Sequence, residues 1–162
     1  MIDQAEQPVT IRPATADDQA TITALIRSAR LNPRNLEWVN FLVAETQGQI
    51  IGIRQVKTHA AGTREVASGY VLPAFRRYGV SRRLMEEILH REAGVLYLMC
   101  DRQWAAYYQQ FGFQAVVAGA LPTDFRREYR IGRLITTLMT LFRLKIIPMM
   151  RPASRARSNG NG

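Results

Sequence analysis

The pattern of apolar and polar residues in the first half of the chain predicts one helix and four strands. Alternation of apolar and polar side chains over residues 8–15 indicates a strand, and a one-sided apolar pattern directly after it indicates a helix. Two apolar runs, 41–46 and 49–59, are separated by turn residues, which predicts an antiparallel hairpin. A fourth strand is expected to stop at Pro73, because proline cannot continue a strand ladder.

The second half of the chain continues the same pattern of alternating helices and strands. The elements expected here are a helix at 81–92, a buried central strand in the fully apolar run 95–100, a short helix that ends at Gly112, a strand at 113–117, an amphipathic helix at 124–144 and a closing strand at 145–150. This order predicts an α/β fold with a mixed sheet flanked by helices. Residues 1–151 are expected to form a single domain, and residues 152–162 a disordered tail.

The charge of the chain is concentrated near its C-terminus. The formal net charge is +9; residues 1–123 carry 13 basic and 11 acidic side chains, whereas residues 124–162 carry 9 and 2. Only the last quarter therefore indicates an anionic partner. A single cysteine and the absence of a secretory pattern in the first ten residues favour a cytoplasmic protein.

The predicted helix at 124–144 admits two interpretations. Its apolar stripe is expected to contain Ile131, Leu134, Ile135, Leu138 and Phe142, with arginines on either side. The first interpretation packs this stripe on the sheet and leaves the arginines in solvent. The second places the helix on an anionic membrane surface or on nucleic acid. Few aromatic side chains lie among the basic residues, so nucleic acid has little support. We favour the packed helix.

The loop around Gly79 combines an apolar strand, a glycine and the start of a helix. Backbone N–H groups at a helix N-terminus, together with the helix dipole, form a binding site for phosphate oxygens. Gly79 and Ser81 are small enough for the backbone to approach a ligand, and four arginines add positive charge, namely Arg76, Arg77, Arg82 and Arg83. The spacing excludes a Walker motif and a GxGxxG motif. The alternative is a simple turn with solvated arginines.

Two motifs resemble those of the GNAT N-acetyltransferase family. The segment Arg76–Ser81 is similar to the family motif Arg/Gln-x-x-Gly-x-Gly/Ala, with serine in the last position as a departure. About thirty residues later, "AAYYQQFGF" resembles the family segment A-x-x-F-Y-x-x-x-G-F. The resemblance covers roughly residues 9–117. It implies an α/β fold with a mixed, mostly antiparallel central sheet. It also implies acetyl-CoA as co-substrate and transfer of an acetyl group to a primary amine by direct attack in a ternary complex.

The resemblance also implies roles for individual residues. The pantetheine arm would lie along the strand backbone, and the loop amides would hold the pyrophosphate; the expected binding residues are Tyr70, Val71, Leu72, Arg76, Arg77, Tyr78, Gly79, Val80, Ser81 and Arg82. Glu65 is the expected general base and Tyr108 the expected acid that protonates the thiolate. The alternative for Glu65 is a surface pair with Arg64 or with a neighbouring strand. The alternative for Tyr108 is a core stripe at helical spacing, formed by Trp104, Tyr107, Tyr108 and Phe111.

Several alternatives stay open at this point. A non-catalytic acyl-CoA-binding module attached through its basic helix would carry the same loop, and a longer acyl group is a further variant. Cys100 is interpreted as a packing residue. His59 and His90 stand alone, without partners at metal-ligand spacing, so no metal is expected. The acceptor is expected to be a small-molecule or protein amine, and the chain a monomer or homodimer.

Overall fold

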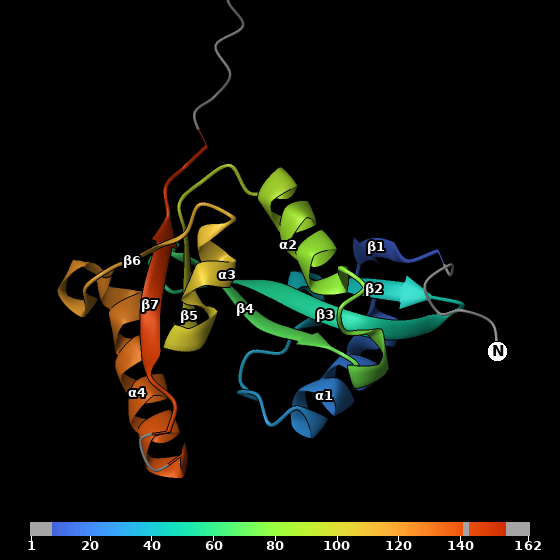
Figure 1. Cartoon of the computed structure of the whole chain (residues 1–162), viewed down its shortest axis with the longest axis horizontal. Helices are drawn as coiled ribbons and strands as arrows, with labels where there is room; N and C mark the ends of the chain where they lie inside the picture. The colour runs from blue at the N-terminus through green and yellow to red at the C-terminus, as the bar shows by residue number, and fades with distance from the viewer. Residues whose placement is uncertain (1–7, 141–142, 155–162) are drawn as a thin grey trace, which may run out of the picture. The chain divides into compact units, whose positions relative to one another are not determined.

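The computed structural model describes residues 8–140 and 143–154. It divides into two compact units, the first made of Met1–His59 and Arg64–Arg91, the second of Ala60–Thr63 and Glu92–Gly162. Within the described residues the fold is mixed α/β, and the strand pairs inside each unit are antiparallel (Figure 1). The predicted fold class is therefore confirmed.

The first unit is a four-stranded sheet with a helix on each face. Its strands follow chain order, and its elements are β1 (Thr10–Pro13), α1 (Gln19–Ser28), β2 (Phe41–Thr46), β3 (Gln49–Thr58), β4 (Arg64–Val71) and α2 (Val80–Arg91). The predicted hairpin corresponds to β2 and β3, in which Val43 faces Ile53. Because neighbouring residues of a strand point to opposite faces, Ile53 packs in the α1 cluster while Gly52 lies beneath α2.

The second unit contains three paired strands and a long helix. Its elements are β5 (Leu96–Asp101), α3 (Ala105–Gln109), β6 (Gln114–Ala115), α4 (Thr123–Thr140) and β7 (Ile146–Arg151), with β7 between β5 and β6. A separate apolar cluster of Leu121, Phe125 and Tyr129 anchors the start of α4, with Tyr97 and Met99 of β5 packed against it. The closing strand was predicted correctly, and α4 begins one residue earlier than expected.

Two of the expectations for this unit concern its strands. In β5, Leu96, Leu98 and Cys100 are buried, and Tyr97 and Met99 between them are half-buried against the cluster at the start of α4. The strand expected at 113–117 is reduced to the two residues of β6. The expected tail at 152–162 lies largely outside the described residues.

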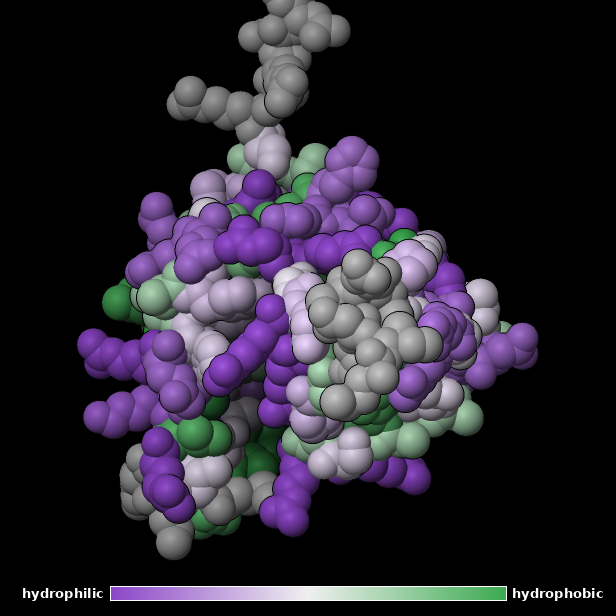
Figure 2. All heavy atoms as spheres, turned by 45° about the vertical axis from the view of Figure 1, so that its right-hand side comes forward, coloured by the Kyte–Doolittle hydropathy of each residue, from purple (hydrophilic) through white to green (hydrophobic). Residues whose placement is uncertain are grey.

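The molecular surface is mainly polar in the view of Figure 2, where hydrophilic side chains surround smaller hydrophobic areas. No helix within residues 8–140 and 143–154 is long and apolar enough to cross a membrane.

Candidate functional site

The loop between β4 and α2 has the backbone geometry of an anion site. After β4, a short 3-10 turn (Pro73–Phe75) leads to Arg77 and Gly79, both with positive φ, at 72° and 74°. The amide of Arg83 donates to the carbonyl of Gly79 at 3.0 Å, in the first turn of α2. The amides of Val80 to Arg82 therefore precede this bond, where N–H groups point out of the helix end.

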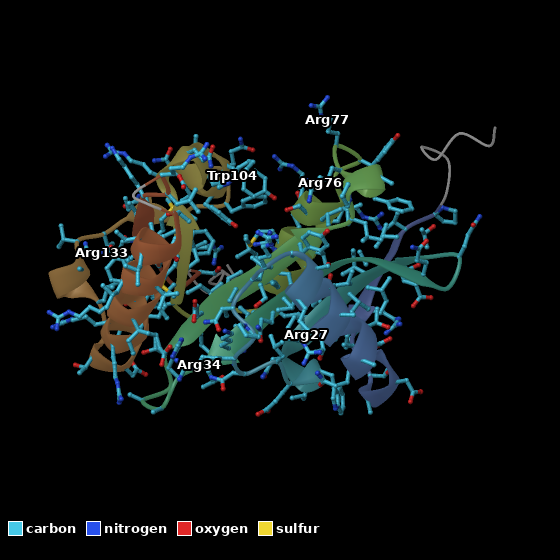
Figure 3. All side chains as sticks on the ribbon, turned by 90° about the horizontal axis from the view of Figure 1, so that it is seen from below. Arg27, Arg34, Arg76, Arg77, Trp104 and Arg133 are labelled. Atoms are coloured by element: carbon cyan, nitrogen blue, oxygen red, sulfur yellow. The ribbon has the colours of Figure 1, made fainter. Side chains whose placement is uncertain are left out.

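The four arginines of the loop have different roles. Arg76 donates from Nε to the carbonyl of Val71 at 3.1 Å, and its guanidinium lies 5.7 Å from the ring centre of Tyr70. Arg77 is exposed and points away from the ribbon (Figure 3). Arg82 makes a 3.5 Å surface pair with Glu86. The fourth arginine, Arg83, donates to the carbonyl of Val9 at 2.6 Å, so it ties β1 to α2 instead of serving the loop.

A buried arginine beneath this loop was missed by sequence reasoning. Arg54 of β3 is only 5% exposed, and its Nη2 donates to Oγ of Ser81 at 3.2 Å. It also fills the space above Gly69, where an added Cβ would lie 2.6 Å from Nη2. Its only sequence signal is a cation within the apolar run of β3. The serine that departs from the family motif is therefore the hydrogen-bond partner of a buried guanidinium.

Strand β4 carries a bulge close to this arginine. Ile53 faces Tyr70 and Gln55 faces Ala67, so Arg54 lies opposite two residues of β4. Ser68, one of these two, has a φ of 55°, and its Oγ accepts a 2.6 Å hydrogen bond from Nε2 of Gln55. A bulge of this kind bends the strand and redirects its side chains.

Glu65 is buried and paired with a histidine. Its side chain is 6% exposed, that of His59 is 10% exposed, and His59 Nε2 lies 2.8 Å from Glu65 Oε2. Arg64 instead donates to Oγ1 of Thr58. The alternative in which Glu65 only pairs on the surface, with Arg64 or with a neighbouring strand, is therefore wrong, because its carboxylate is buried against His59. The candidate base belongs to the first unit.

Tyr108 lies on α3, in the second unit, and is half-buried. Its ring contacts Tyr107 and Phe113 edge to face, with ring centres 5.1 and 6.2 Å apart. The expected core stripe is incomplete, because Trp104 at its start is 57% exposed. Tyr108 is thus held by aromatic contacts without being fully buried. The candidate acid belongs to the second unit and the candidate base to the first.

Cys100 is unsuited to act as a nucleophile at neutral pH. Its Sγ is buried 3.7 Å from Sδ of Met149. Burial first, and the charge of Asp101 second, raise the pKa of the thiol to about 11. Among the described residues, no group of three His, Cys, Asp or Glu side chains could hold a metal ion.

Comparison with known proteins places these features in context. A family model described as an acetyltransferase (GNAT) domain matches residues 37–115. That range includes the loop, Arg54, Glu65 and Tyr108. No curated protein has a sequence that matches the chain.

Solved structures share the fold at low sequence identity. N-acetylglutamate synthase from Neisseria gonorrhoeae, crystallised with coenzyme A and N-acetyl-glutamate, is 24% identical (TM-score 0.73), covering 93% of this chain and 36% of that one. The ribosomal-protein-S18-alanine N-acetyltransferase from Escherichia coli is 18% identical (TM-score 0.60; 94% and 98% covered). A Salmonella typhimurium protein solved with its cofactor acetyl-CoA is 20% identical (TM-score 0.61; 96% and 99% covered). The chain thus spans little more than a third of the synthase.

Proposed function

Because the chain carries a GNAT acetyltransferase domain, we propose that it transfers an acetyl group from acetyl-CoA to a primary amine. The observation that carries this proposal is the loop between β4 and α2, with Gly79 at positive φ and helix amides directed out of the helix end. We assign the activity to residues 1–151, with α4 as an element additional to the catalytic machinery.

The residues of the first unit fit the anionic part of acetyl-CoA. A pyrophosphate needs several N–H donors at one point, and the amides from Arg77 to Arg82 provide them. A Cβ at Gly79 would meet nothing within 4 Å, so the space beside this backbone is open. The backbone of Tyr70, Val71 and Leu72, directly before the loop, would bind the pantetheine arm.

Glu65 and Tyr108 would manage the two protons of the reaction. An alkyl ammonium has a pKa near ~10, so it must lose a proton before its nitrogen can attack the thioester carbon. Glu65 would accept that proton while His59 holds its other oxygen. As the carbon–sulfur bond breaks, Tyr108 would donate its hydroxyl proton to the leaving thiolate. Direct transfer agrees with the raised pKa of Cys100, which disfavours an acyl-cysteine route.

The acceptor is proposed as a class only. The synthase and the alanine N-acetyltransferase are named for acceptors that are an amino acid and a protein alanine. Both acceptors present a primary amine, so we would test free amino acids and short peptides with unblocked N-termini. A chain that binds acetyl-CoA but acetylates none of these amines would support the second candidate, a non-catalytic acyl-CoA-binding module.

The decisive experiment is calorimetric titration with acetyl-CoA of the wild type, Gly79→Asp and Gly79→Asn. Asparagine and aspartate have the same size and both tolerate positive φ, so their difference isolates the added negative charge. We expect the aspartate variant to bind at least about tenfold more weakly than the asparagine variant, because its charge opposes the pyrophosphate. Wild-type protein that does not bind acetyl-CoA would overturn the proposal.

A further inference from the structure

Helix α4 buries large apolar side chains in its first half and exposes them in its second half. In the first half, Phe125 is fully buried and Tyr129 is 4% exposed, both in the cluster with Leu121. In the second half, Leu134, Ile135 and Leu138 are 68%, 51% and 76% exposed. The interpretation that packs the stripe on the sheet is therefore wrong for these three residues. Of the other two residues of the predicted stripe, Ile131 is half-buried and Phe142 lies outside the described residues.

The three exposed residues form one surface, which we call the α4 apolar face (Leu134, Ile135 and Leu138). At 100° per residue their side chains share one side of the helix, about 150° away from Phe125 and Tyr129. The same helix thus packs inward at its start and presents an apolar face to solvent further along. An exposed apolar face of this kind marks an interaction surface.

The charges beside the α4 apolar face are mainly positive. Arg127 and Arg130 are exposed on or next to this side of the helix. Arg133, labelled in Figure 3, is also exposed, but its guanidinium lies 5.9 Å from the ring centre of Tyr129, on the other side. The helix has two acids, and one of them, Asp124, is engaged by the amide of Ala61 and the hydroxyl of Thr63. The other, Glu128, is half-buried. A partner of this surface must therefore accept both apolar side chains and positive charge.

Two other occupants fit these observations less well. A second copy of the chain would bring its own arginines against these arginines, and three side chains are far fewer than the ~20–30 residues per side of a stable protein interface. Nucleic acid would satisfy the arginines but would leave the α4 apolar face in water. An anionic lipid surface satisfies both, because its headgroups attract arginine and its acyl boundary accepts leucine and isoleucine.

We propose that α4 binds the surface of an anionic membrane, with the α4 apolar face directed into the lipid and Arg127 and Arg130 at the headgroups. The helix would lie in the interface without crossing it, in agreement with its length and composition. This proposal does not depend on the transferase activity. Arg126 is excluded from it, because its Nη2 already donates to the carbonyls of Gly119 and Leu121.

The test is sedimentation of the full chain with vesicles of phosphatidylcholine alone and of phosphatidylcholine mixed with phosphatidylglycerol. We expect binding to the mixed vesicles only, and a loss of about fivefold in partitioning for each arginine removed. Arg127→Gln with Arg130→Gln should therefore weaken binding about 25-fold. The matched control, Arg27→Gln with Arg34→Gln, removes the same charge from exposed positions of the first unit and should change little.

The apolar contribution is tested separately with Leu134→Gln and Leu138→Gln combined. We expect this variant to lose binding to mixed vesicles, whereas Val39→Gln, an equally exposed apolar position outside α4, retains it. Equal binding by the charge variant and its control would overturn the proposal, as would no binding of wild type. A dimer on light scattering that the leucine variant abolishes would identify a second copy instead, and tighter binding to duplex DNA than to vesicles would identify nucleic acid.

Discussion

Replacing Gly69 by alanine places a methyl group against the buried guanidinium of Arg54. The new Cβ would lie 2.6 Å from Nη2 and 2.7 Å from Cζ, closer than van der Waals contact permits. The φ angle of Gly69 is not positive, so alanine meets no backbone strain there. The cost comes entirely from moving the arginine.

The size of this cost depends on how far Arg54 can yield. The end of an arginine is flexible, but this one is 5% exposed and donates to Ser81, so moving it breaks a partly buried hydrogen bond. Overpacking of this kind costs about 1–3 kcal/mol, and the lost hydrogen bond about 1 kcal/mol of that. We expect the free energy of unfolding to fall by about 2 kcal/mol, or the melting temperature by about 4–8 °C.

A double-mutant cycle measured by urea unfolding tests the mechanism. Gly94→Ala is the matched control, because a Cβ there meets nothing within 4 Å and its φ is not positive. In an Arg54→Met background, the flexible thioether can make room, so the penalty of Gly69→Ala should fall below ~0.5 kcal/mol. An unchanged penalty in that background would show that the guanidinium is not the obstacle and would refute the reasoning.

Three further predictions concern the candidate site and the charges of the two units. Glu65→Gln keeps an acceptor for His59 but removes the carboxylate that would take the proton. It should therefore lower kcat by about 10²–10⁴-fold while the calorimetric Kd for acetyl-CoA is unchanged; unaltered turnover would exclude Glu65 as the base. Hydrogen bonds from Arg12 lower the pKa of Asp18 from 3.8 to about 2. The stability from this pair should therefore be present above about pH 4 and lost as the pH falls toward 2, and Asp18→Asn should abolish this part of the acid-unfolding profile. Cys100, with its pKa raised to about 11, should react with a disulfide reagent at pH 8 only after unfolding, and equal rates in native and unfolded protein would contradict its burial.

Local patterns allowed much of the fold to be predicted. The hairpin of β2 and β3 was correct because its turn residues lie between two apolar runs, and Gln47 and Gly48 both have positive φ. Helix α2 was correct to within one residue at each end, since its apolar positions recur at helical spacing. Periodicity failed for α4, because it reveals an apolar face but not whether that face meets the sheet; Phe125 and Tyr129 are the residues that do.

The candidate site was predictable only where its residues are close in sequence. The loop from Arg76 to Ser81 could be identified, because the strand end, the glycine and the helix start are consecutive. The pair of His59 with Glu65 crosses the turn between β3 and β4, and it depends on how these strands end. The pair of Arg54 with Ser81 joins β3 to α2 over 27 positions, which no local pattern reports.

Small residues beneath α2 determine how the start of this helix is held. A Cβ at Gly52 would lie 3.0 Å from Cγ1 of Val80, so glycine at this position lets the start of α2 approach β3 closely. Gly69 leaves room for Arg54, whose guanidinium reaches the hydroxyl of Ser81 in the first turn. The direction of the first amides of α2 is therefore fixed by packing on β3 and by one partly buried hydrogen bond. Because binding of a pyrophosphate depends on the direction of these amides, residues that never touch the ligand would still determine its affinity.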